Sequence, residues 1–164
     1  MDFPNLPHII DGDFKLSESK AVSVYICDRW CPELMGKNAE ERAHIMMLQC
    51  LIEECFVGFV MQGFSSPDKE AAFAKGMEKL PAIAEWLGSK QFLIGAKPSL
   101  VDFYMFEIIE TLNAISGSNG VYTALPKLEA YHDRVLALPG MNEYYNSDDC
   151  IKSPFFVPQC QLSM

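Results

Sequence analysis

The side chains in this sequence that could bind a metal or attack a substrate are cysteine, histidine and serine, together with the acidic residues. Six cysteines are present, but their nearest spacings, Cys-x3-Cys and Cys-x4-Cys, differ from the usual pattern of a zinc site. The three histidines are scattered singly along the chain. A disulfide framework is typical of much smaller secreted chains. We therefore predict reduced, packed cysteines and no metal site; these are Cys27, Cys31, Cys50, Cys55, Cys150 and Cys160.

A second candidate for chemistry is the pair Ser99 and Asp102, at the head of an apolar, helix-like segment. Ser-x-x-Asp in that place is typical of a capping box, in which each side chain satisfies a backbone N–H of the first helical turn. A serine and an aspartate without a neighbouring histidine are weak support for a hydrolase. We therefore interpret Ser99 and Asp102 as structural residues.

The elements that must position such groups begin with a hairpin over residues 8–16. The pair Asp11-Gly12 stands between two short apolar segments, which is a strong signal for a tight turn between strands. Ser17 and Ser19 are then expected to cap a helix that runs toward Trp30. The residues from Cys31-Pro32 to position 37 are expected to form a linker.

The remainder of the sequence predicts helices. A first helix over residues 38–64 is apolar on more than one face and is expected to be largely buried. A second should carry Pro67 in its first turn, contain a kink at Pro81 and continue to Leu87. A third should start at Ser99 and end near residue 115, and a fourth should follow Pro126. A short last helix and an apolar tail over 153–158 complete the chain.

Composition limits the functional classes. The formal net charge is -9, so nucleic acid and anionic membrane surfaces would repel the chain. The N-terminus resembles no signal peptide, and the longest apolar run, Cys55 to Met61, is too short to span a bilayer. We expect a soluble protein without membrane insertion, in the cytoplasm or another reducing compartment, and membership of an organellar or cytoskeletal complex remains open.

Three motifs in series resemble the glutathione transferase family, especially its mu class. The first is Asp2-Phe3-Pro4-Asn5-Leu6-Pro7, followed by the hairpin and Glu18-Ser19. The second is Phe92-Leu-Ile-Gly95 leading to Ser99, and the third is Ala124-Leu-Pro ahead of Pro139-Gly140. The resemblance implies a mostly α fold: a partial thioredoxin-like α/β element of hairpin plus helix (1–31), then the all-helical C-terminal domain (32–164).

The resemblance also implies a glutathione site, with glutathione as ligand or substrate. A cis Leu6-Pro7 bond would leave the Leu6 backbone to pair with the cysteinyl unit, beside Asn5. Glu18 and Ser19 would hold the γ-glutamyl end at a helix N-terminus. Many mu enzymes have Gln in place of Glu18. Glu54, with Glu53 adjacent, would reach across a dimer to the glutathione amino group, unless both are ordinary solvated carboxylates.

Two aromatic residues bear on partners and substrates. In mu-like enzymes an aromatic residue at the position of Phe3 inserts into the partner subunit, although Phe3 could instead cover its own core. Phe64 stands on the apolar-substrate side, where mu enzymes carry an assisting tyrosine, and a phenyl ring offers no proton.

The family places its catalytic Tyr, Ser or Cys on a first strand ahead of Leu6-Pro7. The sequence begins after that point, so we expect no catalytic residue in this chain. Tyr25 is not expected to substitute, because it falls within the helix. The strand over residues 8–10 would lack its family neighbour, and we expect another copy or a larger heteromeric assembly to cover this edge.

Three functions remain open from the sequence. The first is a catalytically silent transferase-like subunit that serves as a binding or structural part of a larger assembly. The second is a working glutathione transferase that conjugates glutathione to electrophilic small molecules, with the missing segment present in the full protein. The third is a carrier of apolar ligands in the cleft between hairpin and helices.

Overall fold

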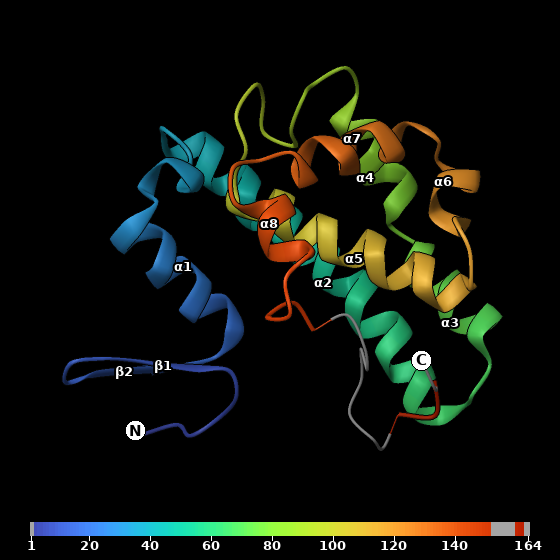
Figure 1. Ribbon diagram of the computed structural model, residues 1–164, viewed down its shortest axis with the longest axis horizontal. Coiled ribbons are helices and arrows are strands. Elements are labelled where there is room, and N and C mark those ends of the chain that lie inside the picture. Colours follow the sequence, from blue (N-terminus) through green and yellow to red (C-terminus); the bar gives the residue numbers. More distant parts are fainter. Residues whose placement is uncertain (1, 152–159, 163–164) are drawn as a thin grey trace.

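The N-terminal part of the computed structural model is a hairpin followed by one helix, and the model describes residues 2–151 and 160–162. Strand β1 (His8–Asp11) pairs antiparallel with β2 (Phe14–Ser17), with Asp11 opposite Phe14 next to the turn. Gly12 takes φ +60° in that turn, which a residue without Cβ adopts readily. Helix α1 (Ser19–Trp30) packs on the hairpin (Figure 1). The predicted hairpin and helix are confirmed.

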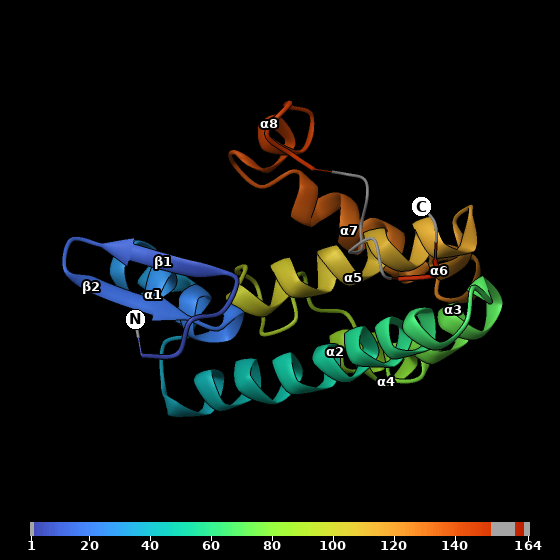
Figure 2. The same cartoon turned by 90° about the horizontal axis from the view of Figure 1, so that it is seen from below.

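The rest of the described chain is helical. Figure 2 shows α2 and α5 running side by side, with α5 between α2 and α7. The predicted fold class, a partial thioredoxin-like element followed by a helical domain, is confirmed. The bounds are η1 (Pro32–Met35), α2 (Ala39–Ser65), α3 (Lys69–Met77), α4 (Leu80–Leu87), α5 (Leu100–Ser116), α6 (Gly120–Ala124), α7 (Lys127–Leu136) and α8 (Met141–Tyr145).

Helix α2 starts where the sequence predicts but is buried on one side only. Asn38 caps it by accepting the Glu41 N–H at 2.8 Å, and the Glu41 carboxylate accepts the Lys37 N–H at 2.8 Å. The expectation of a largely buried helix is wrong. One face lies in the core through Ile45, Leu48, Gln49, Ile52, Cys55, Phe59 and Gly63, whereas the other exposes Met46, Met47, Phe56, Val57, Met61 and Phe64.

The length and apolar composition of α2 would also suffice for a membrane span, with a mean hydropathy of 1.5 over its most apolar window. A core helix of a globular protein has the same two properties. In this structure α2 packs against α3, α4 and α5, and a third of that window is buried. Helix α2 therefore contributes one face to the core and exposes apolar side chains on the other.

The segment after α2 contains two helices where the sequence analysis predicts one kinked helix. Pro67 precedes the first of them, because the cap is Asp68, whose carboxylate accepts the Ala71 N–H at 3.0 Å. Pro81 lies in the first turn of α4, where its missing N–H costs no helical hydrogen bond. The chain therefore breaks before Pro81 rather than bending at it.

Smaller differences concern the connections. The expected linker contains the 3-10 helix η1, and α6 is a short helix that was not predicted between the third and fourth predicted helices. Those two predicted helices correspond to α5 and α7, and the short last one to α8. The apolar tail over 153–158 lies outside the described residues.

The head of α5 carries the capping box expected at Ser99 and Asp102. Asp102 is fully buried, and one carboxylate oxygen accepts the Ser99 N–H and hydroxyl, each at 2.8 Å. The other oxygen accepts the Leu93 N–H at 2.9 Å and the Tyr131 hydroxyl at 2.7 Å. Asp102 thereby fastens the loop before α5 and helix α7 to the head of α5, which is a structural role.

Candidate functional site

The N-terminal segment brings together the residues that the family resemblance assigns to glutathione. The Leu6-Pro7 peptide bond is cis. The Asn5 side-chain amide donates to Glu18 Oε1 at 2.7 Å, and Asn5 Oδ1 accepts the Leu6 N–H at 2.9 Å. Glu18 is followed directly by Ser19, and all these residues are exposed. Asn5, Leu6, Pro7, Glu18 and Ser19 thus form one exposed cluster, in which the Leu6 donor is already engaged by Asn5.

Glu18 has an unusual backbone conformation in this cluster. Its φ is +74°, and it is the sole non-glycine residue with a positive φ in the described part of the chain. Such a conformation costs free energy in a residue with a Cβ and persists where the surroundings enforce it. Here it turns the chain from β2 into α1, while the Glu18 carboxylate makes no capping bond and accepts instead from Asn5.

The expectation that Ser17 and Ser19 cap α1 is wrong. Glu18 holds the cap position without a side-chain hydrogen bond, and Ser19 is the first residue of the helix. The Ser17 hydroxyl donates instead to the Phe3 carbonyl oxygen, which ties the N-terminal segment to β2. The Ser19 hydroxyl therefore has no capping bond and is exposed at the N-terminal end of α1. An anion is favoured in that place by the helix dipole.

A cavity of about 240 Å³ connects this cluster with the helical domain. Ser19 and Lys20 line it from α1, Phe56 from α2, and Tyr104 from α5. Lys20 forms an ion pair with Glu53 of α2, and the hydroxyls of Ser23 and Tyr104 lie 2.8 Å apart. These contacts hold α1 against α2 and α5. Ser19, which is predicted to hold glutathione, therefore lies in the same cavity as residues of the helical domain.

Two residues predicted for the site lie away from this cluster. Glu54 pairs with Lys79 of the same chain at 3.2 Å, whereas the neighbouring Glu53 faces α1. Phe64 is half-exposed near the end of α2, roughly 16 Å along the helix from Glu53 at 1.5 Å per residue. Its carbonyl oxygen accepts from the Gln161 amide at 3.0 Å. The roles of Glu54 across a dimer and of Phe64 beside a substrate remain predictions.

The aromatic side chain of Phe3 is 80% exposed. The alternative that Phe3 covers its own core is therefore wrong for this chain. Leu6, Ile10 and Phe14 are also exposed, so four large apolar side chains lie on the surface of residues 2–17. Phe3 remains a predicted contact with a partner.

Among the described residues, the candidate hydroxyl and thiol groups are not activated for the chemistry of a glutathione thiol. The Tyr25 hydroxyl donates to Asp11 at 2.7 Å, and this hydrogen bond raises the pKa of Tyr25. Burial raises the pKa of Cys27 and of Cys55 to about 11, the direction opposite to that of a reactive thiolate. All six cysteines are free thiols, and nowhere in residues 2–151 and 160–162 do three metal-ligating side chains gather.

Sequence reasoning missed the residues that join the two parts of the chain. The ion pair between Lys20 and Glu53 and the contact between Ser23 and Tyr104 depend on how α1 lies across α2 and α5. The partners are separated by 33 and 81 residues in the sequence, so no local sequence pattern could have predicted these contacts. Only the position of Lys20 next to Ser19 could have drawn attention to it.

The comparisons with known proteins decide the family. Residues 47–139 match the family model described as the C-terminal domain of glutathione S-transferase. The chain is 32% identical over 157 residues to the class-mu 26 kDa isozyme 7 of Fasciola hepatica, covering 94% of this chain and 70% of that protein. The chain belongs to the glutathione S-transferase family.

Other members of the glutathione S-transferase family agree with this assignment. The Mu 1 enzyme of Oryctolagus cuniculus is 32% identical over 96% of this chain and 72% of its own length. Among solved structures, that of the glutathione S-transferase Blo t 8 superposes with a TM-score of 0.82 at 21% identity, covering 99% of this chain and 78% of the other. That likeness shows the fold. The chain spans about 70% of the length of its mu-class relatives.

Proposed function

We propose that this glutathione S-transferase-like chain is catalytically silent and acts as a binding or structural subunit of a larger assembly. The observation that carries the proposal is the outer edge of β1. Within the described residues β1 pairs with β2 alone, in a sheet of two strands. A bare strand edge with exposed apolar side chains invites pairing with another chain. A two-stranded hairpin is also marginally stable unless something packs on it.

The state of the candidate catalytic groups supports a silent subunit. Lowering the thiol pKa of glutathione needs a hydrogen-bond donor or a positive charge beside the sulfur. The Tyr25 hydroxyl is committed to Asp11, and the raised thiol pKa values of Cys27 and Cys55 leave those groups protonated at neutral pH. Phe64 has no proton to offer an electrophile. We therefore expect this chain to leave the conjugation rate of glutathione with an activated chloroarene at its uncatalysed value.

The partner that we propose is a second copy of the chain or a different subunit that covers β1 and Phe3. The described structure supports this through the exposed side chains of Phe3, Leu6 and Ile10, which lie on one N-terminal element. We place the protein in the cytoplasm or another reducing compartment, which the six free cysteines support.

A substitution at this surface tests the proposed contact. In Phe3→Ala and Ile10→Lys we expect the dissociation constant of the assembly to rise roughly tenfold or more, because an aromatic anchor is lost or a charge is placed on the edge. Sedimentation velocity over a concentration series measures it. Ile151→Lys is the matched control, because Ile151 is as exposed as Phe3 and borders the pocket between α5 and α8, which no hairpin residue lines. Equal association of all variants would contradict the proposal.

A second candidate function is a working glutathione transferase that conjugates glutathione to electrophiles. The cluster of Asn5, Glu18 and Ser19 favours it, because a purely structural subunit needs no such polar group at a helix N-terminus. Calorimetry with glutathione, comparing the native chain with Ser19→Ala, separates the two. Conjugation above the uncatalysed rate together with binding that depends on Ser19 would favour the enzyme.

A further inference from the structure

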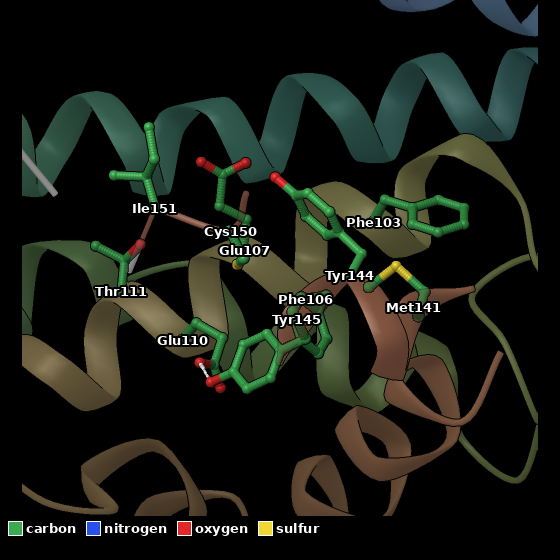
Figure 3. A pocket seen from close by; sticks show the side chains of 10 residues that line it. All are labelled: Phe103, Phe106, Glu107, Glu110, Thr111, Met141, Tyr144, Tyr145, Cys150 and Ile151. Atoms are coloured by element: carbon green, nitrogen blue, oxygen red, sulfur yellow. Dashed lines mark hydrogen bonds between the residues drawn. The ribbon is translucent and has the colours of Figure 1, made fainter. Parts of the chain in front are cut away.

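A cavity of about 370 Å³ opens between α5 and α8 (Figure 3). Its wall is aromatic and apolar, made by Phe103 and Phe106 of α5 and by Met141, Tyr144 and Tyr145 of α8. A cavity of this size suits a small organic molecule. None of the residues predicted for glutathione lines it. It is therefore separate from the glutathione cluster.

Glu107 is the one carboxylate of this cavity that has no donor among the described residues. Its side chain projects from α5 between the rings of the cavity wall and the side of α2 (Figure 3). Burial beside these apolar groups raises the pKa of Glu107, although the side chain keeps contact with solvent. The neighbouring Glu110 differs, because it accepts from the Tyr145 hydroxyl and lies 2.7 Å from His132 Nε2. Glu107 is therefore an exposed carboxylate that borders the cavity and has no donor in the described part of the chain.

A second observation comes from the adjoining cavity of about 240 Å³, which Glu107 also lines. Gln49 of α2 borders this cavity with only 6% of its surface exposed. Its amide nitrogen Nε2 has no hydrogen-bond partner in the described structure. A buried amide without a partner costs free energy, so its presence needs an explanation. The two adjoining cavities therefore share an exposed carboxylate, Glu107, and one of them borders the unpaired buried amide nitrogen of Gln49.

We propose that these two adjoining cavities bind a small organic cation, namely a protonated amine on an aromatic or apolar body. The ammonium group donates to the Glu107 carboxylate and lies against the rings of Phe103 and Tyr144, which attract a cation through their faces. The apolar body fills the cavity over Met141 and Phe106. The Gln49 amide serves a polar group at the inner end of the ligand. The smaller cavity also borders Ser19, so the proposed ligand would lie next to the residues predicted for glutathione. The inference depends neither on the assembly role nor on catalysis.

The charges around the site favour a cation over an anion. Lys20 of α1 and Glu53 of α2 line the smaller cavity but pair with each other, so neither compensates Glu107. The other titratable groups lining the two cavities are Tyr104, Glu110, Tyr144, Tyr145 and Cys150. None of these supplies a positive charge. A ligand amine supplies the positive charge that Glu107 lacks, and the rings beside it add a cation–π contact to this ion pair.

The test compares two probes of equal shape, naphthylmethylamine and its neutral isostere naphthylmethanol, by NMR titration of the full chain. In the native chain we expect the amine to bind about tenfold or more tightly than the alcohol. Glu107→Gln keeps the side-chain shape. In this variant the affinity for the amine should fall to the affinity for the alcohol. Glu85→Gln is the matched control, because Glu85 is exposed on α4 outside both cavities. It should leave both affinities unchanged.

Two further measurements keep the result interpretable if Glu107→Gln lowers stability. Glu107→Asp retains the charge and should keep a preference for the amine. Burial raises the pKa of Glu107. Lowering the pH through that pKa should weaken binding of the amine and leave binding of the alcohol unchanged, because the neutral carboxyl no longer pairs with the ammonium. Equal affinities of amine and alcohol in the native chain would overturn the proposal, as would an amine affinity that Glu107→Gln leaves unchanged.

Discussion

Replacing Asp102 with alanine is expected to destabilise the fold by about 4 kcal/mol, which is a large part of the stability of an ordinary domain. The buried carboxylate accepts four hydrogen bonds, from the Ser99 N–H, the Ser99 hydroxyl, the Leu93 N–H and the Tyr131 hydroxyl. Alanine leaves buried donors without partners in three separate segments. Urea denaturation followed by circular dichroism measures the loss.

The control for this experiment is Tyr131→Phe, which removes one of the four bonds and leaves the carboxylate in place. We expect a loss of about 1 kcal/mol, since a single hydroxyl is deleted and Asp102 keeps three donors. Burial, followed by the Asp102 charge, raises the pKa of Tyr131 well above its usual range, so the hydroxyl donates at all ordinary pH values. A loss in Asp102→Ala no larger than that in Tyr131→Phe would contradict the role of Asp102 as the tie between the loop, α5 and α7.

The second large effect is expected at the crossing of α3 with α5. Leu112 is fully buried, and Leu112→Ala should cost about 3 kcal/mol, because the surrounding helices only partly fill the cavity left behind. A Cβ on Gly76 of α3 would lie 2.3 Å from Leu112 Cδ2 and 3.1 Å from Phe59 Cδ1. Gly76 is therefore what allows the two helices to approach so closely.

A double-mutant cycle separates this close approach from ordinary cavity formation. In the native chain Gly76→Ala should destabilise by about 1 kcal/mol, because overpacking outweighs the better helix propensity of alanine. In the Leu112→Ala background the same change should stabilise by about 1 kcal/mol, since the new methyl group occupies the vacated space. Chemical denaturation of the four proteins gives the coupling free energy. Additive effects would mean that Gly76 and Leu112 do not share this space.

Local patterns in the sequence predicted much of the fold. The Asp11-Gly12 turn, the Asn38 start of α2 and the Ser99–Asp102 box each depend on contacts within a few residues, and each is present in the structure. Apolar periodicity and proline positions are also local, and they predicted six helices, whereas the described residues form eight α-helices and one 3-10 helix. The single helix predicted across Pro81 failed because proline fits both a kink and a first turn.

The exposed face of α2 and the cavity at Glu107 could not be predicted in this way. Met46 and Met61 have the composition of core residues, and only the placement of α3 and α5 shows that they lie outside the core. Glu107 is an exposed acidic residue of α5, and the sequence gives no sign that it borders a cavity with α8, which follows more than thirty residues later. The glutathione residues were named through the family resemblance, while their mutual contacts came from the structure.

We propose that this glutathione S-transferase fold works as a part of an assembly and does not conjugate substrates. The most direct measurement is the mass of the chain isolated from its own source under non-denaturing conditions, with bound small molecules retained. We expect a particle heavier than one 18.4 kDa chain, made with a second copy or with other subunits and free of glutathione. A dimer that carries glutathione would contradict the claim and would favour the enzyme.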